Sequence, residues 1–174
     1  MPKMKEFIEN NGPWSQLVTI KNIELQALQD ETSIALNNQL TVTPFLIPHR
    51  DEFSETVGYR ITGPKKTALF IPDIDKWHTW NKSIIEEVKK VDYAFLDATF
   101  FNQKEVKRAM TEVPHPFVEE TMALFKKESK ATKNKVIFIH FNHTNPSLQE
   151  QSSVKKEAEL LGFNFASEGE NYEL

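Results

Sequence analysis

Four ionisable side chains stand directly after stretches of apolar residues that are typical of buried β-strands. His49 follows residues 41–48, Asp73 follows 68–72, and Asp97 and His140 end two further runs that begin at 93 and 136. Strand ends project their side chains into a common crevice even when they are far apart in sequence. We therefore expect these four residues to converge.

Imidazole and carboxylate groups without thiolates suit zinc, iron or manganese, and such ions lower the pKa of bound water. The chain has 0 cysteines, so any metal site must use these donors. No Gly-x-Ser-x-Gly elbow or phosphate-binding glycine loop offers another chemistry. The pattern indicates metal-dependent hydrolysis, although a histidine or aspartate at a strand end also commonly caps a turn.

Composition narrows the partners. The 174 residues carry a net charge of -4, which gives no long-range attraction to nucleic acid or to an anionic membrane. The apolar runs are far shorter than the roughly 20 residues of a membrane-spanning helix. We expect a soluble, cytoplasmic protein that acts on a small-molecule substrate and has no membrane partner, and the charge does not favour nucleic acid as a partner.

The elements that would position these residues fall into two groups. The first part is mostly strand after one helix, with the helix at 3–10 and strands at 16–20, 23–28, 40–47, 56–62 and 67–71. The second part alternates helix and strand, with helices at 83–91, 117–128 and 147–161 and strands at 93–96, 135–139 and 163–166. This order predicts one layered domain of mixed α/β class.

Successive segments resemble the later motifs of metallo-β-lactamase-fold proteins, in the same order. They are Thr41-Val-Thr-Pro-Phe-Leu-Ile-Pro-His49, Phe70-Ile-Pro-Asp73, Phe95-Leu-Asp-Ala-Thr-Phe100 and Ile137-Phe-Ile-His-Phe-Asn-His143. Three more stretches are most similar to the pyrroloquinoline-quinone biosynthesis protein B family: residues 48–59, Val113-Pro-His-Pro116 and His143-Thr-Asn-Pro146. The likeness to tRNase Z and to the cyclic phosphodiesterase of phosphonate breakdown is more distant.

The resemblance implies a site with two metal ions, Zn²⁺ in the first place and Fe or Mn as alternatives. It implies that His49 binds one ion, that His140 binds the other, and that Asp73 bridges both and takes part in catalysis. Asp97 would orient a ligand histidine from behind. His115 falls where phosphodiesterase relatives carry a histidine that assists phosphate binding or leaving-group protonation; a loop histidine between two prolines is the alternative.

The sequence also departs from the family pattern. The usual Gly-Asp-Thr around the bridging carboxylate is replaced by Pro72-Asp73-Ile74-Asp75, so Asp75 is a possible substitute for Asp73. His143 is a second candidate in the motif of His140, and we expect it in a loop or pocket as a supporting residue. His78 matches no motif and is expected to be exposed.

The His-x-His-x-Asp-His loop that supplies most ligands in the family does not occur in these residues. We therefore expect residues 1–174 to form one partial domain, the C-terminal half of an αββα sandwich. Two ligands per metal would bind weakly, because zinc sites normally use three or four protein ligands. The fragment would be inactive alone, and its exposed sheet would favour association, including homo-oligomers.

Two functions remain open. One is a metal-dependent hydrolase of a phosphodiester or another small ester, active in the complete protein. The other is a cofactor-biosynthesis or small-molecule-binding role like that of the pyrroloquinoline-quinone protein, without hydrolase activity. A purely structural α/β interaction domain is a third interpretation, and zinc would leave its stability unchanged.

Overall fold

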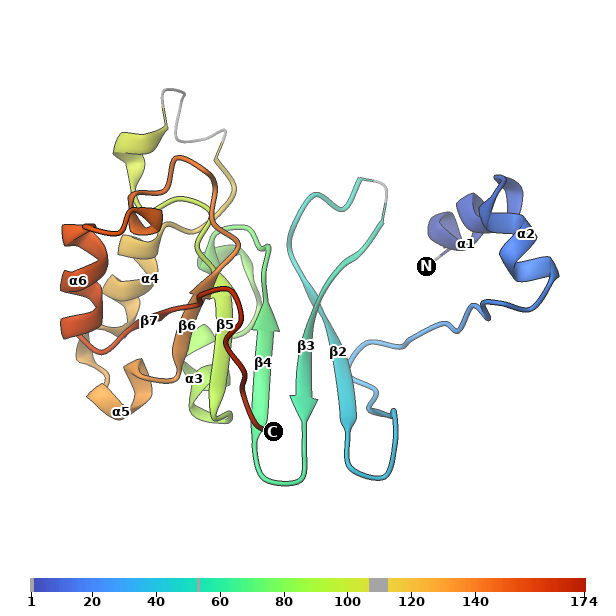
Figure 1. Cartoon of the computed structure of the whole chain (residues 1–174), viewed down its shortest axis with the longest axis horizontal. Coiled ribbons are helices and arrows are strands. Elements are labelled where there is room, and N and C mark those ends of the chain that lie inside the picture. Colours follow the sequence, from blue (N-terminus) through green and yellow to red (C-terminus); the bar gives the residue numbers. More distant parts are fainter. Residues whose placement is uncertain (1, 53, 107–112) are drawn as a thin grey trace.

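A computed structural model of the chain describes residues 2–52, 54–106 and 113–174, and it contains one mixed sheet flanked by helices (Figure 1). The strands lie side by side in the order of the sequence. They are β1 (Ile34–Ala35), β2 (Thr41–Ile47), β3 (Thr56–Thr62), β4 (Thr67–Ile71), β5 (Tyr93–Asp97), β6 (Val136–Ile139) and β7 (Asn164–Phe165). This arrangement confirms the predicted mixed α/β class.

Strand direction brings four strand ends to one edge of the sheet. β2 pairs antiparallel with β3, and β3 pairs antiparallel with β4, so β2 runs in the same direction as β4. β4, β5 and β6 then pair in parallel, with Phe70 opposite Phe95 and Phe95 opposite Ile137. The carboxyl ends of β2, β4, β5 and β6 therefore share one edge.

Helices cover one face of the sheet. They are α3 (Ile84–Lys89), α4 (Val118–Leu124), α5 (Lys130–Lys133) and α6 (Ser153–Leu160), while α1 (Pro2–Asn10) and α2 (Trp14–Thr19) lie away from the sheet (Figure 1). Ser83 and Ser152 cap α3 and α6 by accepting backbone N–H groups. Side chains from α3, α4 and α6 join alternate residues of the strands in one apolar core, which fixes the edge where the strands end.

The opposite face of the sheet carries the other set of alternating side chains. Phe70 and Phe95 are only half-buried there, and the C-terminal segment crosses this face (Figure 1). The ring of Tyr172 packs edge-on against Tyr93 and Phe95, with centroids 5.3 and 5.0 Å away. This contact shields part of the second face.

Two predicted strands are wrong. Residues 16–20 fall largely in α2, and residues 23–28 form no regular element. A short β-branched run has no strand ladder to join when no neighbouring strand pairs with it, whereas a helix satisfies its own backbone groups. The helix predicted over 147–161 is also shorter, because the N-cap at Ser152 starts α6 after a 3₁₀ turn at Pro146–Leu148.

No helix within residues 2–52, 54–106 and 113–174 is both long and apolar enough to cross a membrane.

A buried ion pair ties the sheet to α3. Glu87 is 6% exposed, and its carboxylate contacts the Arg60 guanidinium and the Lys90 ammonium at 2.7 Å each. Burial raises the pKa of Glu87, but the two cations outweigh burial and lower it. The two cations therefore stabilise the carboxylate of Glu87, which would be costly to bury without a partner.

We expect Arg60→Met to lower the free energy of unfolding by about 1 to 3 kcal/mol, because Glu87 then keeps only one partner. Urea unfolding at neutral pH measures the change. Lys5→Met is the matched control, since its partner Glu9 is exposed and such pairs contribute at most about 1 kcal/mol. Equal losses in both variants would contradict the assignment.

Candidate metal centre

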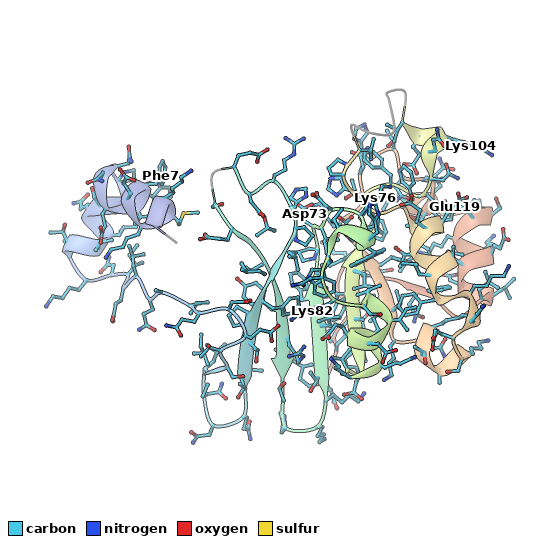
Figure 2. The ribbon with its side chains drawn as sticks, turned by 180° about the vertical axis from the view of Figure 1, so that it is seen from behind. Phe7, Asp73, Lys76, Lys82, Lys104 and Glu119 are labelled. Carbon is cyan, nitrogen blue, oxygen red and sulfur yellow. The ribbon has the colours of Figure 1, made fainter. Side chains whose placement is uncertain are left out.

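The expected convergence of strand ends occurs at the shared edge of the sheet. His49 stands two residues after β2, Asp73 two residues after β4, Asp97 is the last residue of β5, and His140 follows β6 directly. Figure 2 shows Asp73 at this end of the sheet. The structure thus brings together all four residues singled out by their positions.

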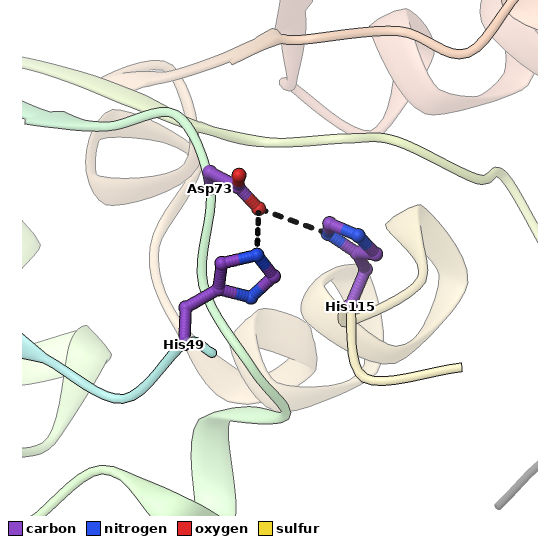
Figure 3. Close-up of side chains that lie close together, drawn as sticks. All are labelled: His49, Asp73 and His115. Atoms are coloured by element: carbon purple, nitrogen blue, oxygen red, sulfur yellow. Dashed lines mark ion pairs between the residues drawn. The ribbon is translucent and has the colours of Figure 1, made fainter. Parts of the chain in front are cut away.

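A fifth residue, His115, enters the cluster from the loop before α4. Phe117 forms a parallel bridge with Phe100, and this bridge fixes the loop beside the end of β5. The imidazole of His115 lies 5.2 Å from that of His49, measured between ring centroids. His49 and His115 approach Asp73 from two sides (Figure 3).

One oxygen of Asp73 is the centre of this arrangement. Asp73 Oδ1 lies 3.2 Å from His49 Nε2 and 3.3 Å from His115 Nδ1. It is buried, yet within the described part of the chain it accepts no hydrogen bond. Buried carboxylate oxygens are otherwise paired, so this atom has a lone pair without a donor.

His49 is oriented by a second carboxylate. Its Nδ1 lies 3.0 Å from Asp75 Oδ1, and a carboxylate oxygen accepts a proton from that nitrogen. The Nδ1–H tautomer leaves the Nε2 lone pair facing Asp73. A histidine that donates one N–H to a carboxylate and presents its other nitrogen is typical of metal ligands. Asp75 therefore stands behind His49, and Asp73 stands in front of it.

Asp97 is saturated with donors. It is 0% exposed. Oδ1 accepts from the N–H and the hydroxyl of Thr99 at 2.8 and 2.7 Å, while Oδ2 accepts from Ile74 N at 3.1 Å and from His115 Nδ1 at 2.8 Å. Burial alone raises the pKa of this carboxyl, but the bonds from His115 and Thr99 and the nearby His140 outweigh it and lower the pKa to about 2. The geometry suits an orienting group more than a ligand.

His140 occupies a strained backbone position at the end of β6. Its φ is 60°, in the left-handed region that few side chains adopt without compensation. Its side chain is 45% exposed, and its Nδ1 lies 3.1 Å from the Thr99 hydroxyl and 3.9 Å from Asp97 Oδ1. The Asp97 carboxylate raises the pKa of His140, although burial opposes this.

The remaining histidines lie outside the cluster. His78 is exposed, as predicted. His143 is exposed in the turn after β6 and makes no hydrogen bond or ion pair with the cluster in the described residues, so its supporting role has no contact behind it. Trp77 and Trp80, which flank His78, are buried in the core.

The cluster fits a divalent metal ion. Two ligands about 2.0 to 2.1 Å from a tetrahedral ion stand about 3.3 to 3.4 Å apart, close to the separations of Asp73 Oδ1 from the two imidazoles. Two groups of potential ligands share Asp73: one adds His49 and His115, the other adds Asp97 and His140. The structure thus offers three potential ligands for one metal ion, whereas the sequence predicted two.

Comparison with known proteins finds a family model and two curated relatives that match this sequence. The family model described as "Beta-lactamase superfamily domain" matches residues 2–141. Coenzyme PQQ synthesis protein B of Gluconobacter oxydans is 27% identical over 165 residues, which cover 83% of this chain and 53% of that protein. The protein of the same name from Nitrosococcus oceani is 27% identical over 132 residues, covering 70% of this chain and 42% of that one.

A solved structure shares the fold. Zinc-bound PqqB from Methylobacterium extorquens superposes with a TM-score of 0.70 and 21% sequence identity, over 100% of this chain and 61% of that chain. By the sequence comparison, the chain spans about half the length of the curated relatives that it matches.

Proposed function

The chain belongs to the beta-lactamase superfamily, and from this premise we propose that it carries the metal-binding end of a metal-dependent hydrolase. His49, Asp73 and His115 hold one ion, and Asp73 together with His140 contributes to a second. Zinc is the metal that this set of nitrogen and oxygen donors suits best, with iron or manganese as alternatives.

The observation that carries the proposal is Asp73 Oδ1, a buried oxygen with two imidazole nitrogens at 3.2 and 3.3 Å and no hydrogen bond from the described residues. Without a cation, its lone pairs face the Nε2 lone pair of His49. A divalent ion among these atoms removes that repulsion. It would also lower the pKa of bound water and polarise an ester or phosphoryl oxygen.

We propose that His115 is a metal ligand and not the acid that assists the leaving group. Its Nδ1 lies 2.8 Å from Asp97 Oδ2 and 3.3 Å from Asp73 Oδ1, so a metal ion at Asp73 would take this nitrogen in place of its hydrogen bond to Asp97. With His115 included, one ion has three protein ligands, the number that catalytic zinc sites normally use. The sequence analysis predicted weak binding from two ligands per metal. With three ligands, we expect this chain to bind one metal ion tightly.

The substrate class that we propose is a phosphodiester or another small ester, acted on by the complete protein. The names of the two curated relatives favour a second candidate, a cofactor-biosynthesis role without hydrolase activity. Hydrolysis of a chromogenic phosphodiester by the zinc-loaded complete protein, lost in its His49→Ala variant, would support the first. Zinc binding without any such hydrolysis would favour the second.

Zinc is expected to stabilise the isolated chain. At a zinc concentration about 100 times the dissociation constant, binding adds about 2.7 kcal/mol to the free energy of unfolding. Thermal unfolding with and without zinc, together with the bound stoichiometry, measures the effect. His49→Ala should remove most of it, while His78→Ala, the matched exposed histidine, should retain it. Equal stabilisation of both variants would contradict the site.

A further inference from the structure

The hydroxyl group of Thr99 lies within hydrogen-bond distance of three side chains of the cluster. Its hydroxyl oxygen lies 2.7 Å from Asp97 Oδ1, 3.1 Å from His140 Nδ1 and 3.2 Å from His115 Nδ1. Thr99 belongs to the segment Phe95–Phe100, in which Asp97 is the residue that resembles a family motif. It lies between a buried carboxylate and two imidazoles, so its one hydroxyl hydrogen can be donated to only one of these three groups.

The direction of each hydrogen bond follows from the number of hydrogens available. The oxygens of Asp97 already accept two backbone N–H groups, from Ile74 and from Thr99 itself. A carboxylate in such surroundings accepts from the Thr99 hydroxyl as well. A hydroxyl has one hydrogen, so the Thr99 oxygen is left to accept, and His140 must donate to it through Nδ1–H.

We infer that Thr99 is a positioning residue. Its hydroxyl group, held by Asp97, accepts the Nδ1–H of His140 and so leaves the Nε2 lone pair of that imidazole free to bind a metal ion. This inference rests on the proposed metal centre. It adds a defined tautomer and a residue that sets it, because the nitrogen that binds a metal is decided by the bond that the other nitrogen makes.

His140 depends on this bond more than the other histidines do. His49 is held by Asp75 and His115 by Asp97, each at hydrogen-bond distance. Asp97 Oδ1 is 3.9 Å from His140, too far for a hydrogen bond, and the Thr99 hydroxyl is the partner within reach among the described residues. With a half-exposed side chain, His140 would otherwise sample several rotamers.

The backbone of Thr99 is fixed independently of its hydroxyl. Its carbonyl accepts the N–H of Asn142 at 2.9 Å. The side chain of Asn145, which is 1% exposed, donates to the carbonyl of Ala98 at 2.7 Å. Removing the hydroxyl therefore removes its bonds to Asp97 and His140 while these backbone bonds remain.

The test compares Thr99→Val, which replaces the hydroxyl with a methyl group of similar size, and Thr99→Ser, which keeps the hydroxyl. Thr62→Val, at the exposed end of β3, is the matched control. In the metal-free protein, at a pH high enough for His140 to be neutral, ¹⁵N NMR of the imidazoles should show His140 as the Nδ1–H tautomer in wild type, Thr99→Ser and Thr62→Val. Thr99→Val should show a mixture of tautomers.

Zinc titration gives the second readout. Thr99→Val should bind the zinc ion that contacts His140 about 10 to 100 times more weakly, the usual effect of losing an orienting partner, and Thr99→Ser should recover most of the affinity. A wild-type tautomer in Thr99→Val, or a disturbed one in Thr99→Ser, would overturn the inference, and the Ser variant decides it even if the Val variant fails to fold. If wild type binds no zinc, the proposed centre fails, whereas the metal-free NMR result still decides the role of Thr99.

Discussion

Asp73→Asn is expected to weaken zinc binding by more than about 100-fold, beyond the 10- to 100-fold effects that follow from losing an orienting neighbour. The change keeps the size of the side chain but removes the negative charge shared by the two groups of potential ligands. Isothermal titration with zinc measures the affinity, and circular dichroism confirms that the fold is kept.

Asp75→Asn is the matched control for this prediction. Asp75 contacts the Nδ1 of His49 and stands behind that imidazole. We expect a loss of about 10-fold, since an amide oxygen can still accept the Nδ1–H bond. A larger loss in Asp75→Asn than in Asp73→Asn would show that Asp75 is the bridging carboxylate and would contradict our assignment.

Asp97→Asn is expected to have the largest effect on stability, a loss of about 3 kcal/mol at pH 7. The carboxylate accepts four hydrogen bonds, whereas an amide group offers one acceptor oxygen and turns an NH₂ group toward existing donors. Urea unfolding of the metal-free protein measures the loss. A loss below about 1 kcal/mol would mean that the network contributes little.

The same residue predicts a pH dependence. The pKa of Asp97 is about 2 in the folded protein, below the value of about 3.9 in an unfolded chain. A lowered pKa contributes stability that is fully present above about pH 5 and is lost as the pH falls toward 1, by about 2 to 3 kcal/mol in total. Asp97→Asn lacks this titration, so its stability should fall less than that of wild type between pH 4 and pH 2. Equal slopes would contradict the assignment.

Much of the fold could be predicted from the sequence because pattern and pairing agree. The strands of 41–47, 56–62 and 67–71 alternate or are continuously apolar, and each has a neighbour with which to pair. The runs at 16–20 and 23–28 have a similar composition but no such neighbour, and they form a helix and an irregular segment. Composition alone does not reveal whether a partner strand is present.

The candidate site divides in the same way. His49, Asp73, Asp97 and His140 were predictable, because parallel strand ends meet whatever the loops do. The place of His115 was not, since it depends on how the loop before α4 lies against Phe100. The saturated hydrogen bonding of Asp97 also lies beyond the sequence, since it depends on the positions of backbone N–H groups.

The most direct test of the proposed centre is anomalous diffraction at the zinc absorption edge from crystals of the zinc-loaded chain. We predict an anomalous peak about 2.0 to 2.2 Å from Asp73 Oδ1 and from an imidazole nitrogen of both His49 and His115. The absence of a peak at Asp73, or a zinc ion bound only at other surface residues, would contradict the proposed metal centre.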